Sequence, residues 1–177
     1  YHHCVEKLGK ENVTIDKMGN VIAHKAGMKA DAPHVMLTAH MDEVGLMVIN
    51  ATDDGLLRVR AIGGIDPRVL VSKRVKVGYD LLATDGKDEK KAISGVIGVK
   101  AHHLQKKSDF AHVLEHNELF IDIGASSKED AEKYVEVGDY AWFDTTFAPF
   151  GEGLVKGKAL DDRVGCAILM ELLKKRY

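Results

Sequence analysis

Short runs that alternate apolar and polar residues fill the middle of the sequence, and this pattern restricts the fold more than any other feature. Only residues 126–135 interrupt it with a helical pattern, opened by the capping-box pair Ser126 and Glu129. Many short strands with one helix predict a small barrel. The alternating runs lie on either side of Asp53-Asp54-Gly55 and at residues 69–77, 92–99, 118–125 and 139–144.

The two ends of the chain carry a different pattern. Residues 34–40, HVMLTAH, are typical of a strand that is buried on both faces and becomes polar at its carboxyl end. Residues 161–177 begin with acids, end with bases and carry an apolar stripe, which predicts a helix. The predicted fold class is therefore α/β, with a partial catalytic-type α/β domain of residues 1–60 and 156–177 interrupted by a β-rich insert of residues 61–155.

Charge and composition exclude several classes of partner. The 25 basic and 27 acidic residues are interleaved and give a net charge of −2, so no basic patch suits a nucleic acid or an anionic membrane. No apolar run approaches the roughly 20 residues of a membrane-spanning helix. Cys4 and Cys166 have no companions, which disfavours a disulfide framework and favours a reducing cytoplasm. Because the chain starts at Tyr1 without a methionine and stops in an unfinished α/β pattern, we expect a fragment.

His40 and Asp42 follow the predicted strand of residues 34–40. The period of two in a strand places both side chains on one side, where the carboxylate can orient the imidazole. A metal-binding histidine usually donates its second ring N–H to such a carboxylate. A His-x-Asp pair also occurs wherever polar groups simply end a strand, so this pair alone does not define a site.

Asp161 and Asp162 form the second candidate cluster, at the predicted start of the last helix. Aspartate is a favoured N-cap, and acids in the first turn are stabilised by the helix dipole, so capping explains such a pair without any further role. The alternative is a carboxylate that bridges two divalent ions at the same sheet edge as His40. The sequence leaves both interpretations open, and the distance between His40 and Asp161 distinguishes them.

Taken together, these segments resemble the glutamyl aminopeptidase and tetrahedral aminopeptidase family, also known as cellulase M. The resemblance lies in the ordered blocks TAHMDEVGLMV, IGGIDPRVL, GVIGVKAHHL, ELFIDIGASSKEDAE, VEVGD and VKGKALDDRVGCAILMELL, which span nearly the whole chain. It implies a dinuclear metallo-exopeptidase acting on peptides, with Zn, Co or Mn ions. It also implies an inserted barrel-like or PDZ-like domain that forms homo-oligomers.

The resemblance assigns roles to individual residues. It implies that His40 is a terminal metal ligand, that Asp161 bridges two metals, and that Asp42 is the catalytic-site acid that orients His40. Asp162 resembles the residue that follows the bridging ligand and is not itself a ligand. The family's glutamate general base and remaining ligands lie downstream of ALDDR, beyond Tyr177. We therefore expect the 177-residue chain alone to hold metal weakly and to be inactive.

Two function classes remain open at this stage, and a third follows only from a family name. The chain is either part of a metal-dependent aminopeptidase or a non-catalytic assembly piece whose working part is the β insert. Glycoside hydrolysis follows only from the cellulase name and requires two acids flanking a sugar cleft. The adjacent His102 and His103 are interpreted as a solvent-exposed pair rather than a metal chelate.

Overall fold

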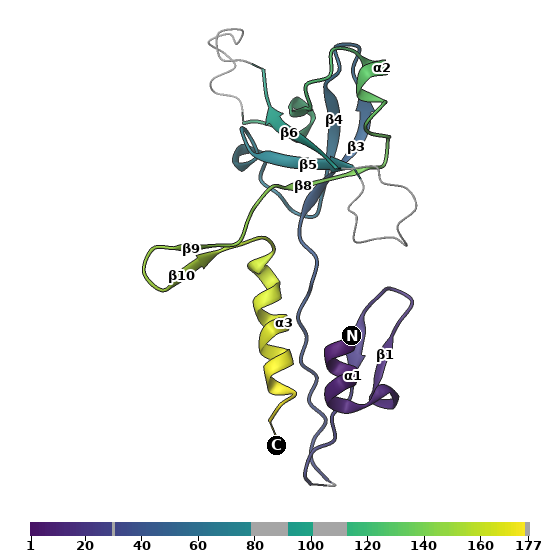
Figure 1. Ribbon diagram of the computed structural model, residues 1–177, viewed down its shortest axis with the longest axis vertical. Coiled ribbons are helices and arrows are strands. Elements are labelled where there is room, and N and C mark those ends of the chain that lie inside the picture. The colour runs from purple at the N-terminus through teal and green to yellow at the C-terminus, as the bar shows by residue number, and fades with distance from the viewer. Residues whose placement is uncertain (30, 79–91, 101–112, 176–177) are drawn as a thin grey trace. The chain divides into compact units, whose positions relative to one another are not determined.

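The computed structural model describes residues 1–29, 31–78, 92–100 and 113–175 (Figure 1). The chain folds as two compact units, and each is described by itself. The terminal unit consists of Tyr1–Glu43 and Ala159–Tyr177, and the barrel unit consists of Val44–Lys158. The predicted His102–His103 pair lies outside the described residues.

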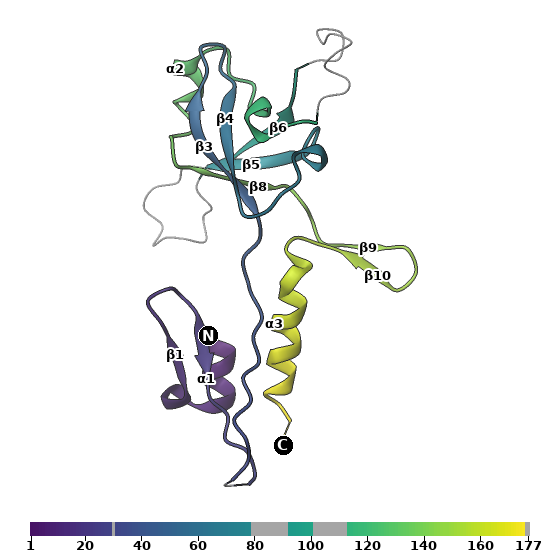
Figure 2. The same ribbon diagram turned by 180° about the vertical axis from the view of Figure 1, so that it is seen from behind.

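Six strands of the described residues close into an antiparallel barrel, in the order β3-β4-β7-β6-β5-β8 (Figures 1 and 2). Alternate side chains point inward because successive residues of a strand face opposite sides. The closed barrel in a mixed α/β chain confirms the predicted fold class. The strands are β3 (Gly45–Ala51), β4 (Leu57–Ile62), β5 (Arg74–Gly78), β6 (Ile93–Gly98), β7 (Phe120–Asp122) and β8 (Tyr140–Phe143).

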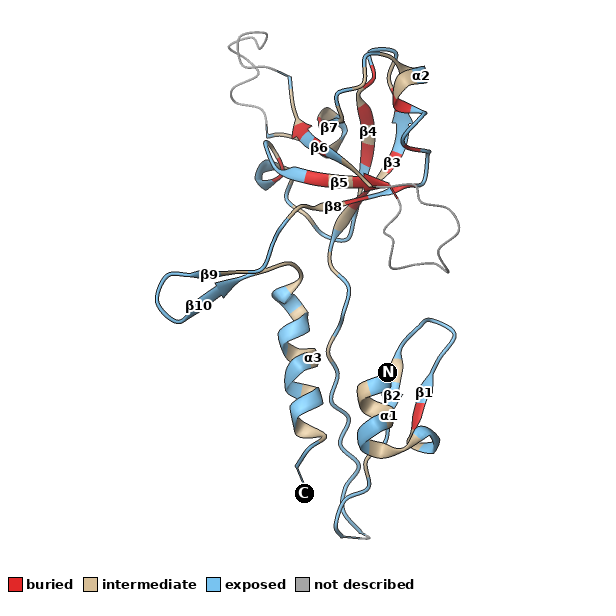
Figure 3. Ribbon diagram, viewed as in Figure 1, coloured by how far each residue is buried: buried red, intermediate tan, exposed pale blue. Residues whose placement is uncertain are grey.

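The inward side chains of the barrel form the main hydrophobic core among the described residues (Figure 3). Leu57, Val77 and Ile121 are completely buried there. Full burial of an aliphatic side chain contributes roughly 1.5–3 kcal/mol, so this cluster is a main source of stability of the barrel unit. Its other fully buried members include Leu46, Val48, Leu70, Val75, Ile97 and Leu119.

Short elements connect the strands or flank them. Helix α2 covers only Lys128–Ala131, and its N-cap is Ser127, whose Oγ accepts a hydrogen bond from the Asp130 N–H at 3.2 Å. The predicted cap Ser126 was therefore wrong by one residue, because the serine that precedes the first helical turn carries the hydroxyl that reaches it. The remaining elements of the barrel unit are η2 (Pro67–Val69), η6 (His116–Glu118), β9 (Ala148–Phe150) and β10 (Leu154–Lys156).

The terminal unit contains a β-hairpin, two short helical elements, one longer helix and an extended segment. Strands β1 (Val13–Ile15) and β2 (Val21–Ala23) pair antiparallel. The Asp16 Oδ1 atom accepts hydrogen bonds from two backbone N–H groups of the turn between them, at 2.8 and 2.9 Å. The helical elements are α1 (His2–Leu8), η1 (Lys10–Asn12) and α3 (Leu160–Leu172).

Two sequence predictions about these units were wrong. The predicted domain boundary near Ala61 lies instead at Val44, because β3 and β4 pair with β8 and β7 and so belong to the barrel. The segment of residues 34–40, predicted as a buried strand, is extended but unpaired, and its apolar side chains are exposed. Burial of the apolar side chains in this run would be favourable, but no other described segment forms strand pairing with it.

Candidate functional site

The polar end of the extended segment is fixed against α3 by two hydrogen bonds to its backbone. Cys166 Sγ donates to the carbonyl oxygen of His40 at 3.3 Å, and Arg163 Nε donates to the carbonyl oxygen of Met41 at 2.9 Å. Both views of the chain show α3 running beside this segment (Figures 1 and 2). The helix therefore determines where the His40 ring lies.

His40 stands between two carboxylates. Its Nε2 atom lies 3.2 Å from Asp161 Oδ1, and its Nδ1 atom lies 3.4 Å from Asp42 Oδ1. The predicted proximity of His40 and Asp161 is thus observed. The Nδ1 atom also lies 3.3 Å from the backbone oxygen of Asp42, which is the largest cause of a raised pKa at His40, and the charges of the nearby aspartates add to it.

The side chains of this site are open to solvent. The exposed fractions are 56% for His40, 88% for Asp42 and 96% for Asp161. Exposure leaves carboxylate lone pairs of the two aspartates accessible to a cation. The site is therefore negatively charged and accessible rather than a closed ion-pair network.

Asp161 and Asp162 play different structural parts. Neither has helical backbone angles, so the regular helix begins after them, and the peptide bond between them is cis. Asp162 Oδ1 accepts a hydrogen bond from the Gly165 N–H at 3.0 Å, which is an N-cap interaction. Capping thus accounts for Asp162, whereas the Asp161 carboxylate faces the imidazole of His40.

Gly165 makes room for this cap. A Cβ atom placed on Gly165 would lie 2.5 Å from both carboxylate oxygens of Asp162. Such a distance is far below van der Waals contact, so any larger residue would force the Asp162 side chain to move. The glycine at position 165 thus lets the Asp162 carboxylate adopt its observed position against the Gly165 N–H.

The donor set fits one part of a metal centre. An imidazole nitrogen and a carboxylate oxygen on one tetrahedral ion, with bonds near 2.0–2.2 Å, lie about 3.3–3.5 Å apart, close to the spacing of His40 and Asp161. Asp42 on the second ring nitrogen is the usual partner of such a histidine. Within the residues that the structure describes, no three His, Cys, Asp or Glu side chains form a metal-binding group.

Several residues that shape the site could not be identified from the sequence pattern. Arg163 and Cys166 bind main-chain carbonyl groups, and Lys25 Nζ donates to the carbonyl oxygen of Leu173 at 2.6 Å, at the end of α3. A basic residue at a helix C-terminus satisfies carbonyl groups that have no partner inside the helix. The only sequence signal for Arg163 and Cys166 is their position within one helical turn after the two aspartates.

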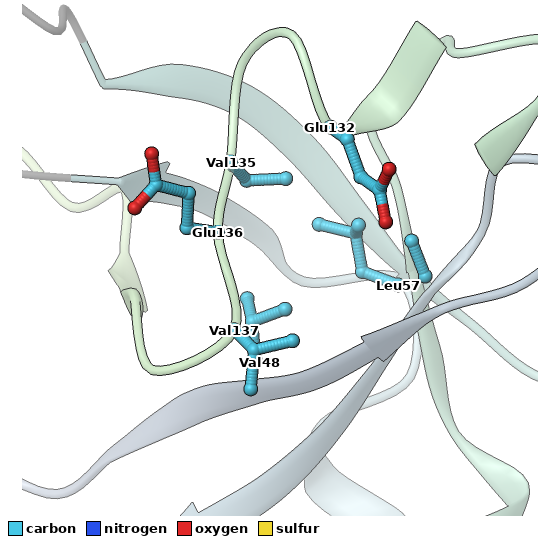
Figure 4. Close-up of a pocket in the computed structure, with 7 residues that line it drawn as sticks. Val48, Leu57, Glu132, Val135, Glu136 and Val137 are labelled. Carbon is cyan, nitrogen blue, oxygen red and sulfur yellow. The ribbon is translucent and has the colours of Figure 1, made fainter. Parts of the chain in front are cut away.

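The barrel unit carries an apolar pocket of about 200 Å³ on its surface. Figure 4 shows Val135 and Leu57 pointing toward each other across it, with the Glu136 carboxylate turned away. Val137 also lines the pocket and is largely exposed. A hollow with an apolar floor and an exposed apolar rim suits a hydrophobic side chain of another polypeptide better than a polar ligand.

Among the described residues, no helix is long and apolar enough to cross a membrane.

Comparison with known proteins places these features in a family. The chain is 35% identical over 167 residues to the lysyl aminopeptidase of Pyrococcus furiosus, covering 93% of this chain and 45% of that protein. The structure of aminopeptidase APDkam598 from Desulfurococcus kamchatkensis matches with a TM-score of 0.76 and 40% identity, over 97% of this chain and 44% of that one.

A third match adds information about assembly. The TET1 peptidase of Pyrococcus horikoshii, which can assemble into a tetrahedron or a large octahedral shell, matches with a TM-score of 0.72 and 34% identity, over 98% of this chain and 49% of that one. This chain thus spans less than half the length of the relatives it matches. The family model for M42 glutamyl aminopeptidases matches residues 19–177, which confirms the resemblance, and the chain belongs to that family.

Proposed function

We propose that this chain supplies part of the active site of a metal-dependent aminopeptidase, which removes N-terminal residues from peptides with two divalent ions and an activated water. The observation that carries this proposal is the 3.2 Å approach of His40 Nε2 to Asp161 Oδ1 in a member of the M42 family. Asp42, on the other ring nitrogen, completes a carboxylate–histidine pair of the kind that accompanies metal ligands.

Each of the three residues has a distinct task. His40, in its neutral form, offers the Nε2 lone pair to an ion, and Asp161 offers a carboxylate that bridges two ions. Asp42 accepts a hydrogen bond from the Nδ1–H group, which fixes the tautomer and raises the basicity of the imidazole. Bound divalent ions would polarise the scissile carbonyl group and lower the pKa of a water molecule.

The remaining ligands and the general base are expected from the part of the relatives' length that this chain does not span. The resemblance places a glutamate base there, which takes the proton of the attacking water and passes it to the leaving amine. Zn, Co and Mn all suit a mixture of imidazole and carboxylate ligands. The unpaired cysteines are the basis for proposing a reducing, cytoplasmic location.

We further propose that the protein forms homo-oligomers through its barrel unit. The assemblies of the Pyrococcus horikoshii relative support this proposal. So do three exposed apolar or aromatic residues: Ile49 on β3, Val137 shortly before β8, and Tyr140 at the start of β8. Exposed apolar residues on one unit are candidates for an interaction site. A Val137→Asp variant that lowers the mass of the assembly in light scattering would support the assignment.

The test of the enzymatic proposal uses the protein encoded by the complete reading frame that contains this chain. Hydrolysis of aminoacyl anilides should cease with a chelator and return with Zn, Co or Mn. His40→Ala and Asp161→Asn should each lower kcat/KM by at least 100-fold, while the matched control His24→Ala, outside the site, should leave it unchanged. Activity that persists without metal, or hydrolysis of cello-oligosaccharides instead of peptides, would refute the proposal in favour of the glycosidase alternative.

A further inference from the structure

One face of α3 binds two consecutive carbonyl groups of the segment that carries His40. Arg163 Nε donates to the carbonyl oxygen of Met41 at 2.9 Å, and Cys166 Sγ donates to that of His40 at 3.3 Å. Residues three apart on a helix lie on the same face, so the two donors act on the segment together. The Arg163 contact is the stronger of the two, because a guanidinium N–H is a charged donor and a thiol is a weak one.

Arg163 joins the two segments that supply the proposed metal ligands. It lies two residues after Asp161, where the regular part of α3 begins. The carbonyl group that it binds belongs to Met41, the residue between His40 and Asp42, and lies 122 positions away in the sequence. A single side chain therefore connects the backbone beside one ligand to the backbone beside the other.

The distance between His40 and Asp161 depends on how their backbones are held. Both side chains are largely exposed, so packing against neighbouring residues contributes little to their placement. An exposed hydrogen bond changes the free energy of unfolding only modestly, because water replaces it in the unfolded chain. Its larger effect is on geometry, and a metal centre requires its ligands to be held within about 0.5 Å of the productive arrangement.

We infer that Arg163 is a positioning residue of the metal centre. It holds His40 at the correct distance from Asp161 through the carbonyl group of Met41. This inference rests on the proposed function, because it assigns a further residue to the same site. In this role the guanidinium binds neither the ions nor the substrate, and it acts through the affinity of the site for divalent ions.

The charge and the hydrogen bond of Arg163 predict opposite effects on that affinity. A positive charge repels a cation, so loss of the charge alone would strengthen metal binding. Loss of the hydrogen bond releases the segment of His40 and would weaken it. Arg163→Gln separates the two effects, because the glutamine amide nitrogen stands as many bonds from Cα as the arginine Nε and is an uncharged donor. Arg163→Met has a similar length and no donor.

The experiment uses the protein encoded by the complete reading frame, freed of metal with a chelator. Calorimetric titration with Zn or Co should show Arg163→Met binding about 10- to 100-fold more weakly, the usual effect of removing a group that orients a metal ligand. Arg163→Gln should bind as tightly as the unmodified protein or more tightly. In crystal structures of the metal-free variants, His40 Nε2 should move away from the Asp161 carboxylate by more than about 0.5 Å in Arg163→Met only.

The matched control is Lys25→Met. Lys25 Nζ also donates to a main-chain carbonyl group, that of Leu173, but at the opposite end of α3 from Asp161. This variant should leave the metal affinity unchanged, so equal weakening by Lys25→Met and Arg163→Met would show only a general structural role and overturn the inference. Unchanged affinity in Arg163→Met, or equal losses in Arg163→Met and Arg163→Gln, would also overturn it.

A different result would count against the proposed function instead. If the unmodified protein bound neither Zn nor Co, the metal-dependent mechanism would be refuted. The separation of His40 and Asp161 in the metal-free structures would then decide by itself whether Arg163 positions His40.

Discussion

The imidazole of His40 is contacted at both nitrogens, and its backbone carbonyl is held by Cys166. Arg163 holds the next carbonyl along the chain in the same way. The ring is thus placed by its main chain as well as by its side-chain partners. In the proposed role of His40 as a metal ligand, this placement of the ring before any ion binds would reduce the entropy that binding otherwise costs.

The pKa of His40 provides a first prediction. The Asp42 backbone oxygen and the nearby carboxylates raise this pKa above 6.5. Because the pKa is raised in the folded chain, the stabilising contribution is complete below pH 6.5 and is lost as the pH rises through the folded value. An NMR titration should show this raised pKa, and Asp161→Asn should lower it. Asp53→Asn, in a turn of the barrel unit, is the control, and a His40 pKa at or below 6.5 in the unmodified chain would contradict the geometry.

The two aspartates provide a second prediction. Asp162→Ala removes the hydrogen bond to the Gly165 N–H and should destabilise the first turn of α3 by about 1 kcal/mol, the usual contribution of an N-cap. Asp161→Ala should leave that turn unchanged and instead weaken binding of Zn or Co. Hydrogen exchange of the Gly165 amide and calorimetric metal titration separate the two effects. If both variants melted the turn equally, the division of roles would be wrong.

At this scale the sequence predicted the grouping of His40, Asp42 and Asp161 but not how they are supported. Ligand-type side chains carry a recognisable pattern because the chemistry requires particular atoms at particular spacings. Arg163 and Cys166 act on carbonyl groups, and every residue has one. A pattern of residue types therefore does not reveal such contacts, which appear only when the backbone path is known.

Among the secondary-structure elements, the β3–β4 hairpin depends on Gly55. Its φ of +85° is unfavourable for other residues, and a Cβ atom there would lie 2.5 Å from the carbonyl oxygen of Ala125. Gly124 offers a matched comparison, since its φ is +81° and nothing lies within 4 Å of its Cβ position. Both glycines lie in the barrel unit, so the pair separates backbone strain from steric overlap.

The third prediction follows from this pair. Gly124→Ala should lower the free energy of unfolding of the barrel by about 1–2 kcal/mol, the usual cost of an L-residue in the left-handed region. Gly55→Ala should lower it by a further 1–3 kcal/mol or so, because the added methyl group overlaps a backbone oxygen that has little freedom to move. Urea unfolding measures both. Similar losses of unfolding free energy in the two variants would mean that the backbone at Ala125 moves to accommodate the added methyl group at little cost.

The barrel strands were predictable from the sequence, and the conformation of residues 34–40 was not. Alternation encodes the two faces of a strand directly, so β3, β4, β5 and β8 followed from residue order alone. The apolar run of residues 34–40 indicates only that burial of these side chains is favourable. It does not indicate which other segment covers them. Helix α2 was overestimated for a related reason, since its capping residues are clear but its length is limited by packing.

For the whole molecule, the division at Val44 rather than Ala61 follows from pairing between strands far apart in sequence. Strand β3 pairs with β8 across nearly a hundred positions, and no local pattern specifies such a partner. The discontinuous arrangement of the terminal unit was accessible from the sequence because the helical period returns only near Asp161. The boundary depended on non-local contacts, and that is why the prediction missed it.

The fourth prediction concerns the activity of the 177 residues by themselves. Purified chain with saturating Zn, Co or Mn should not hydrolyse an aminoacyl anilide above the buffer rate. The reason is that, among its described residues, no three His, Cys, Asp or Glu side chains form a group that could hold a metal ion, and a two-ligand site does not retain a catalytic ion. A single-turnover assay with the complete enzyme as a positive control measures this. Turnover of about 1 s⁻¹ or more, as in ordinary enzymes, would show that the site is complete without a partner.

The contact of Lys25 with the end of α3 has a consequence for the timing of synthesis. Lys25 and Leu173 are 148 positions apart, and the entire barrel unit lies between them. At roughly 5–20 residues per second, a ribosome needs on the order of 7 to 30 s to bridge that separation. During this interval residues 1–43 have been synthesised but α3 has not, so the apolar side chains of residues 35–37 are accessible to chaperones. The barrel, whose strands all emerge earlier than α3, is free to fold first and on its own.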